Sequence, residues 1–316
     1  MLNRAHAVVV LPAVLGGRIA DAGIRRWLSK AELRVDNTRV EPLARVLSVL
    51  GQPPVTSGLA ALRLWGQTGH RPVGWQCGAD PVYLEARLDR LYLHALQDVS
   101  AAQTEGVFHY LQTTLATGRP YAFHRVDSSG YLQREDAMAT MPIRASTAHG
   151  HSPDDFLLEG PPPALHDALQ SELQMCLHEC DVNQERAKAG HYPVNSLWFW
   201  GGGVTSPLQA QRLPALFCDD PLLTGYWLRS DQTPHRWPGS LAACVMGADS
   251  FVAVTPCDAN AADAESCLDE LRMHLARRRI ARLTMLFRDG LHADMRRRHR
   301  LRVWRRSAPQ LSPGGI

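Results

Sequence analysis

The sequence predicts an α/β protein with a mostly parallel central sheet flanked by helices, and an α+β insertion in its middle. Three observations carry this prediction. The chain opens on a continuous apolar run, "AHAVVVLPAVLGG" over 5–17, which is typical of a strand buried on both faces of a parallel sheet. Segments with helical periodicity then alternate with strand-like segments. Two hairpin patterns interrupt this alternation in the middle of the chain.

The composition is that of a globular protein without a strong overall charge. The chain has 316 residues, of which 45% are hydrophobic and 21% charged, and its formal net charge is +3. So small a charge gives no general preference for nucleic acid. The seven cysteines have no repeating spacing, which predicts reduced thiols. Because no clear signal peptide or membrane span is present either, we expect a cytoplasmic protein.

Three helices are predicted after the first strand. The segment 19–30 places Ile24, Trp27 and Leu28 at helical spacing. The segment 41–51 has one apolar face and ends at a glycine, and 59–69 is the third helix.

The middle of the chain has a different pattern. The segment 75–96 predicts a β-hairpin with its turn at "RLD", and 121–135 predicts a second hairpin around Ser128-Ser129-Gly130. Between them, 100–116 begins with a serine at the N-cap position and predicts a helix. A proline-rich loop over 144–163 leads to a helix over 164–180, whose leucines and cysteines form one apolar stripe.

The last third is predicted to return to the α/β pattern. Strands are expected over 194–200, 241–247, 251–255 and 283–287, and a helix over 262–279. The segment 301–306 is expected to pair with 283–287 as a closing hairpin. We therefore predict an α/β core formed by 1–74 and 204–306, an α+β insertion over 75–203, and a flexible tail over 307–316.

The stretch "PVNSLWFWGGG" (193–203) ends in three consecutive glycines, which allow two interpretations. Backbone N–H groups of Gly201, Gly202 and Gly203 could approach an anion closely, or the triplet could be a tight structural turn. The pattern is neither a Walker A loop nor a dinucleotide fingerprint, because "GGGVTSP" lacks both the Gly-Lys-Ser/Thr ending and the third spaced glycine.

Two other groups of residues could suggest metal or nucleic-acid binding, and a structural role explains most of both. Cys176, His178 and Cys180 do not share one helix face, so the sequence predicts no metal site there. Arginine dominates 271–306, where the only acidic residues are Asp289 and Asp294. The arginines alternate with apolar residues, so a solvated face explains most of them, and nucleic-acid binding is kept as an alternative function.

The segment "NQERAKAGHYPVNSLWFWGGG" (183–203) resembles part of the archaeal-type cofactor-independent phosphoglycerate mutases, which belong to the alkaline-phosphatase superfamily. "GADPVYLEARLDRLYL" fits the same order, and the resemblance covers about 75–230. It implies an alkaline-phosphatase-like fold. The positions that match the mutase pattern are Asn183, Arg186, Gly190, Pro193, Asn195, Trp200, Gly201 and Gly203.

The same resemblance implies a two-metal site that this chain does not reproduce. Such mutases have an aspartate at the end of the first strand and late ligands in an Asp-His-Ser-Thr order. Here the first strand ends in proline and glycine, and the late strand has Asp289 and His292 in another order. Two metals clamp an in-line phosphoryl displacement, so loss of their ligands removes the chemistry.

Over the whole chain, the pattern is more similar to RpfE-type regulatory proteins and their proteobacterial relatives. The shared features are the "LP" first strand, "ADPVYL", "PVNSLWFWGGG" and a "VWRR"-like C-terminus. This resemblance favours a non-catalytic regulatory or ligand-sensing protein, without a cofactor or metal, on a degenerate phosphoglycerate-mutase-like scaffold. An active mutase or phosphatase-like metalloenzyme is the alternative.

The predicted ligand is a phosphorylated or anionic small molecule, and a regulatory protein is a further candidate partner. Arg186 is the expected anion partner, because its guanidinium can grip a phosphate or carboxylate with two hydrogen bonds. Asn183 and Asn195 would brace it, with the backbone of Gly201–Gly203 close by. In the alternative interpretation, these side chains only tie the loop to the strand.

Overall fold

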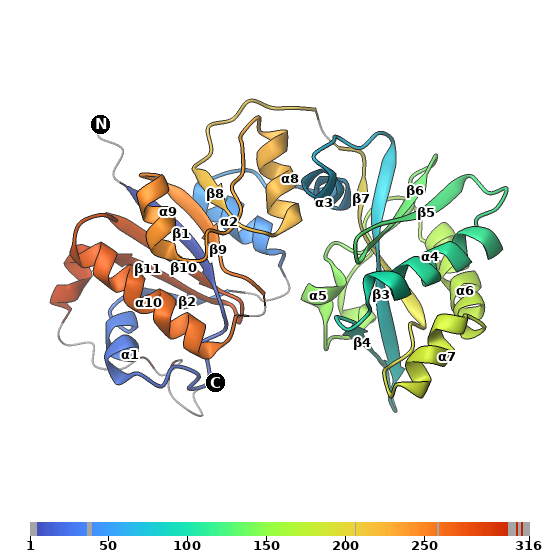
Figure 1. Cartoon of the computed structure of the whole chain (residues 1–316), viewed down its shortest axis with the longest axis horizontal. Coiled ribbons are helices and arrows are strands. Elements are labelled where there is room, and N and C mark those ends of the chain that lie inside the picture. Colours follow the sequence, from blue (N-terminus) through green and yellow to red (C-terminus); the bar gives the residue numbers. More distant parts are fainter. Residues whose placement is uncertain are drawn as a thin grey trace. The chain divides into compact units, whose positions relative to one another are not determined.

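The chain forms two compact units, and each is described by itself. The computed structural model describes residues 5–36, 40–205, 207–257 and 259–302, together with Ala308 and Leu311. Unit 1 comprises Met1–Pro54 and Leu208–Ile316, and unit 2 comprises Val55–Pro207 (Figure 1). The insertion predicted to begin at residue 75 therefore corresponds to a unit that begins at residue 55. None of the described helices is both long and apolar enough to cross a membrane.

Unit 1 is built on a six-stranded, mostly parallel sheet. Its strand order is β2-β11-β10-β1-β9-β8. The neighbours β10, β1, β9 and β8 are parallel, whereas β11 and β2 are antiparallel at one edge. The strands are β1 (His6–Leu11), β2 (Glu32–Val35), β8 (Ala215–Phe217), β9 (Phe251–Val254), β10 (Arg282–Phe287) and β11 (Leu291–Arg296). The predicted buried parallel strand at the N-terminus is confirmed as β1.

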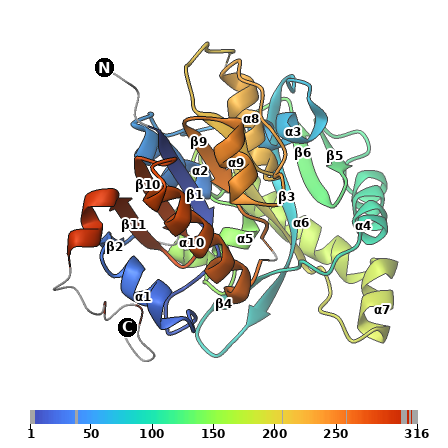
Figure 2. The same ribbon diagram turned by 60° about the vertical axis from the view of Figure 1, so that its left-hand side comes forward.

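Helices cover both faces of this sheet because β1 is apolar on both sides. Val9 and Leu11 point to one face, where they share a core with residues of α1 (Ala22–Leu28), α9 (Leu241–Gly247) and α10 (Ala261–Ala276). Figure 2 shows these three helices on the same side of the sheet. The helix α2 (Pro42–Leu50) contacts β1 and β10.

Unit 2 is an antiparallel five-stranded sheet organised around its long strand β3 (Trp75–Ala86). β3 pairs with β4, β6 and β7, and β5 pairs with β6, which confirms both predicted hairpins. The other strands are β4 (Leu91–Ala95), β5 (Tyr121–Val126), β6 (Ser129–Arg134) and β7 (Ser196–Gly203). The helices of this unit are α3 (Leu59–Thr68), α4 (Ala101–Thr114), α5 (Ala145–Ala148), α6 (Ala164–His178) and α7 (Asp181–Lys188).

One predicted strand is wrong, because 241–247 is the helix α9. The side chain of Ser240 accepts a hydrogen bond from the N–H of Ala243 and so begins a helix. Leu241 and Cys244, three residues apart, both face the core of unit 1. A run of apolar residues this short does not distinguish a strand from a buried helix, and the N-cap is the signal that the periodicity missed.

The closing hairpin predicted for 301–306 is also wrong in its pairing. Both edges of β10 are occupied, by β1 on one side and by β11 on the other. Leu301 ends a 3₁₀ helix over Arg297–Leu301, and residues 303–307 lie outside the described part of the chain. Of the tail predicted to be flexible, Ala308 and Leu311 are described, and both are buried in the core of unit 1.

Several short elements of unit 1 were not predicted. They are β2, β8, β11 and α8 (Pro221–Arg229). β2 is an edge strand with three exposed residues, and β11 carries charged residues at every second position facing away from the main core. The exposed β2 gives no clear periodic signal, whereas β11 has the period-2 alternation of a half-buried strand, which the sequence analysis missed.

A buried arginine holds α3 against the sheet of unit 2. Arg63 donates to Asp80 Oδ1 at 2.7 Å, to Tyr131 Oη at 2.9 Å and to Gly130 O at 2.9 Å. Its guanidinium carbon also lies 4.5 Å from the ring centre of Tyr131 and 4.7 Å from that of Trp200. A charge removed from water in this way is tolerated only when it is paired and hydrogen-bonded.

Replacing Arg63 tests how far unit 2 depends on this group. We expect Arg63→Ala to lower the free energy of unfolding by about 3–5 kcal/mol, because it leaves the half-buried carboxylate of Asp80 without its charge partner. Urea unfolding followed by circular dichroism measures this change. Arg87, whose ion pair with Glu85 is on the surface, is the control, and Arg87→Ala should change little. Equal effects of the two substitutions would contradict the role of Arg63.

Candidate functional site

The predicted anion partner Arg186 is fully buried in α7 and already has partners. Its Nε donates to Tyr192 O at 2.8 Å, Nη1 donates to Gln103 Oε1 at 3.0 Å, and Nη2 donates to Asp98 Oδ2 at 2.9 Å. The Asp98 carboxylate also contacts Nδ1 of His191 at 2.8 Å. An anion would have to displace Asp98 to reach this guanidinium, so the geometry favours the structural interpretation.

The two asparagines of the same motif replace missing backbone hydrogen bonds. Asn183 Nδ2 donates to Leu177 O and to Val194 O, and its Oδ1 accepts from the N–H of Val194. Asn195 accepts from the N–H of Leu84 through Oδ1 and donates to Leu84 O through Nδ2. Both amide groups thereby fasten the segment before β7 to α6 and β3, as the alternative interpretation of the sequence expects.

The three glycines belong to β7 and let other backbone segments come close. The N–H of Gly201 donates to Met141 O, and the N–H of Gly202 donates to Oγ1 of Thr140. A Cβ atom added to Gly203, which has a φ of 147°, would lie 2.5 Å from the backbone nitrogen of Gly58. The first two N–H groups are therefore occupied within the protein, and the triplet serves close packing in unit 2.

The parallel sheet of unit 1 offers a different place for a site. Ligands of open α/β sheets bind beyond the carboxyl ends of the strands. At this edge, Arg288 follows β10, and its Nη2 donates to Thr255 O, just after β9, at 2.6 Å. Nη1 lies 3.3 Å from Thr255 Oγ1. Arg288 thus joins the ends of two strands on either side of β1.

Asp289, the first of the late acidic residues, holds the loop that follows β1. Its Oδ2 accepts hydrogen bonds from the N–H of Val14 and, at 2.6 Å, from the N–H of Leu15. Oδ1 lies 3.4 Å from the N–H of Leu291. A carboxylate that satisfies two backbone donors of a neighbouring loop is a structural group, and this use competes with metal binding.

His292 lies in β11, between two carboxylates. Its Nδ1 is 3.2 Å from Asp36 Oδ2 and 2.9 Å from Arg34 Nη2, and its Nε2 is 3.2 Å from Asp294 Oδ2. Burial opposes ionisation of Asp294, but hydrogen bonds from His292 and Thr284 outweigh this effect and lower the pKa of its carboxyl well below the ordinary range. Asp294 therefore stays ionised, and hydrogen bonds from His292 and Thr284 stabilise its negative charge.

These residues do not fit the two-metal centre that the mutase resemblance implies. Asp289 is bound to the loop after β1, and His292 is enclosed in its own network on β11. In the described ranges, His, Cys, Asp and Glu form no group of three or more that could hold a metal ion.

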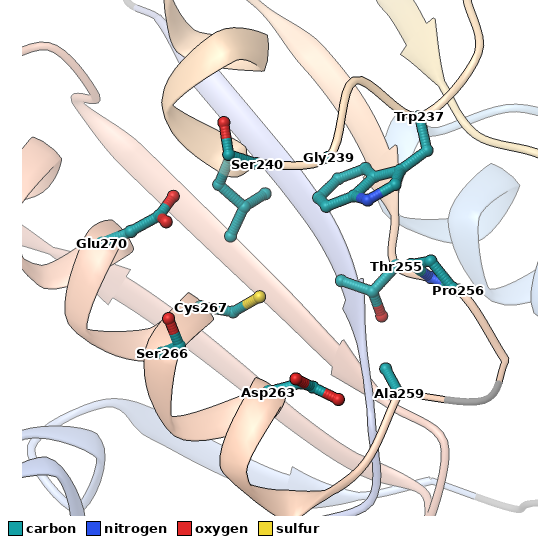
Figure 3. Close-up of a pocket in the computed structure, with 11 residues that line it drawn as sticks. Trp237, Gly239, Ser240, Thr255, Pro256, Ala259, Asp263, Ser266, Cys267 and Glu270 are labelled. Carbon is teal, nitrogen blue, oxygen red and sulfur yellow. The ribbon is translucent and has the colours of Figure 1, made fainter.

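Next to the carboxyl end of β9, unit 1 has a pocket of about 290 Å³. It lies between the loop before α9, the segment after β9 and one face of α10 (Figure 3). The polar and aromatic residues of its wall are Trp237, Ser240, Thr255, Asp263, Ser266, Cys267 and Glu270. The sequence analysis did not identify these residues. The signal available was the i, i+4, i+7 spacing of Asp263, Cys267 and Glu270 on one helix face.

Replacing Arg186 tests both interpretations of the segment 183–203 of unit 2 directly. We expect Arg186→Ala to lower the free energy of unfolding by about 2–3 kcal/mol, since the fully buried guanidinium and its hydrogen bonds to Tyr192, Gln103 and Asp98 are lost. We also expect 3-phosphoglycerate to leave the melting temperature of the unsubstituted protein unchanged. Lys188→Ala, at an exposed position of the same helix, is the control. A thermal shift with 3-phosphoglycerate that Arg186→Ala abolishes would instead support the anion site.

Comparison with known proteins shows the fold. The sequence matches no family model and no curated protein. A solved structure of the PH0037 protein from Pyrococcus horikoshii has a TM-score of 0.52 at 13% identity, covering 93% of this chain and 87% of that chain. A cofactor-independent phosphoglycerate mutase from Thermoplasma acidophilum has a TM-score of 0.41 at 16% identity, covering 92% of this chain and 89% of that chain. The chain has the overall fold of the PH0037 protein.

Proposed function

We propose that this chain is a non-catalytic, ligand-sensing protein of the cytoplasm on a phosphoglycerate-mutase-like scaffold. The observation that carries this proposal is the binding of Asp289 to the loop after β1. Asp289, which the resemblance suggests as a late metal ligand, instead binds the backbone of the loop after β1. The seven cysteines are free thiols, as a reducing compartment requires.

Ligand sensing is supported by the pocket beside β9. Its volume of about 290 Å³ is near the lower end for small-molecule sites. It also lies close to the sheet edge at which α/β folds bind ligands. We assign the sensing role to this pocket of unit 1, because the groups around Arg186 in unit 2 are already occupied by protein partners. Binding of an anion at Arg186 stays a prediction.

Metal content, turnover and stability together test the non-catalytic role. We expect purified protein to contain no stoichiometric Mn or Zn and to leave 3-phosphoglycerate unchanged when these metals are added. We expect Asp289→Ala to lower the free energy of unfolding by about 1–3 kcal/mol, because two backbone N–H groups lose their acceptor. Asp269→Ala, on the surface of α10, is the control.

The active-enzyme alternative gives the opposite result. Metal-dependent turnover that is abolished by Asp289→Asn, with little change in stability, would refute the proposal. Asn keeps one acceptor oxygen for the loop after β1 but is a poor metal ligand, so the substitution separates the two roles.

A second candidate function rests on an arginine cluster of unit 1, formed by Arg278, Arg282, Arg296, Arg297 and Arg300. Arg282 and Arg296 are direct partners in the pairing of β10 with β11, so the cluster gathers at one end of these strands. The positive charge of Arg278 is the main cause that lowers the pKa of Arg297. Asp294, 3.5 Å from Nη2 of Arg282, compensates part of the charge of the cluster, and an anionic partner would relieve the remaining repulsion. Part of the predicted arginine-rich region, 303–306, lies outside the described residues.

Salt-dependent DNA binding tests this candidate. If the cluster binds the phosphate backbone, affinity for a random duplex should fall steeply with salt. Replacing Arg278 and Arg297 together with Gln should then reduce the slope of log K against log [salt] by about 2, since each phosphate contact contributes roughly 0.9. Arg87→Gln, in unit 2, is the control. Absence of binding at low salt would eliminate this function.

A further inference from the structure

The pocket beside β9 has two acidic residues in its wall, Asp263 and Glu270. Within the part of the chain that the structure describes, no Lys, Arg or His lines it. Asp263 Oδ2 accepts from the N–H of Asn260, and Glu270 Oε2 accepts from the N–H of Ala242. Among the described residues, the second oxygen of each carboxylate is left for a ligand. The pocket therefore presents negative charge to whatever enters it.

Arg288 contacts a residue of the pocket wall without lining the pocket itself. The guanidinium of Arg288 reaches Thr255 through O and Oγ1, and its Nη2 lies 3.6 Å from Cys257 Sγ. Thr255 Oγ1 lies 3.1 Å from Val10 O, which it can reach as a donor. These contacts fix Thr255 in the wall, while Arg288 itself is not part of the lining.

The thiol of Cys267, in the same wall, has a raised pKa. Burial, followed by the negative charges of Glu270 and Asp263, raises the pKa of its thiol to about 11. Cys267 is thus a neutral, weakly polar part of the wall at physiological pH and is no nucleophile. Cys267 lies between the two acidic residues on this face of α10, four positions after Asp263 and three before Glu270, and all three line the pocket.

Trp237 supplies an aromatic surface across from this helix face. Its side chain is partly buried and packs on the core of unit 1. Figure 3 shows its ring on one side of the pocket, with Asp263, Cys267 and Glu270 on the other. An indole face attracts a cation most strongly of all aromatic side chains, and a nearby carboxylate adds to the attraction.

We infer that this pocket binds a small organic cation, an alkylammonium or quaternary ammonium compound, between Trp237 and the two carboxylates of α10. The hydroxyl groups of Thr255 and Ser266 would accept hydrogen bonds from polar groups of the same ligand. This inference rests on the proposed ligand-sensing function and specifies its ligand class. It differs from the sequence-based expectation, which was an anionic ligand in unit 2.

Pairs of probes that share a shape and differ in charge test this assignment. Choline is compared with 3,3-dimethyl-1-butanol, and butylamine with 1-butanol, by isothermal titration calorimetry on the full chain. We expect at least one of the two cations, choline or butylamine, to bind. Each neutral probe should bind roughly tenfold more weakly than its charged counterpart, or not at all. A tenfold loss corresponds to about 1.4 kcal/mol of lost charge interaction. Equal binding of charged and neutral probes, or no binding of either amine, would overturn the ligand class.

Substitutions locate the binding. Asp263→Asn and Glu270→Gln keep an acceptor oxygen for the N–H of Asn260 and of Ala242, so the helix ends stay intact. Each should weaken amine binding by roughly tenfold, as should Trp237→Leu. Asp269→Asn removes a charge from the same helix outside the pocket and should leave binding unchanged. Equal losses from Asp263→Asn and Asp269→Asn would reduce the effect to general electrostatics and refute the site.

The outcomes also separate this inference from the proposed function. If neither amine binds and the protein still lacks metal and turnover, the ligand class is wrong while the non-catalytic role stands. If metal-dependent turnover is observed, the proposed function fails regardless of amine binding. Far-ultraviolet circular dichroism and melting temperatures of the variants show whether a variant with weaker binding is still folded.

Discussion

Burial of the Arg63 charge is the constraint on which the sheet of unit 2 depends. One guanidinium reaches Asp80 on β3, Tyr131 and Gly130 on β6, and the ring of Trp200 on β7. A buried cation without these partners would cost several kcal/mol, so α3 can dock only when the three strands are in register. The ion pair therefore contributes specificity for one arrangement of strands more than it contributes net stability.

In unit 1 as well, most polar groups at the ends of the strands are paired within the protein, which limits the ligands they can bind. Asp289 holds the loop after β1, and Arg288 joins the ends of β9 and β10. Asp294 is held between His292 and Thr284. Each of these groups is matched by a partner in the protein, which leaves little capacity for a substrate phosphate or a metal ion. The carboxylates of α10 that line the pocket retain such capacity, and for this reason the ligand site is assigned to them.

The fold class was predictable from the sequence, because long apolar runs and turn residues report β1 and the two hairpins directly. The short elements were not, since β8 has only three residues and β2 is exposed at an edge. Sequence reasoning pointed to Arg186 because arginine is the usual anion partner, but it could not detect Asp98, which lies 88 positions away in the chain. It missed the pocket because Trp237 and α10 meet only in the folded protein.

The segments that carry the mutase resemblance are neighbours in one sheet. Gly78 on β3 pairs with Trp200 on β7, and any side chain at Gly78 would collide with the indole of Trp200. Asp80, of the same β3 motif, is the partner of Arg63. The two motifs therefore require each other for packing, and their joint presence follows from the fold without any shared chemistry. None of their residues lies in the pocket of unit 1, so the resemblance concerns the packing of unit 2 and carries no information about that pocket.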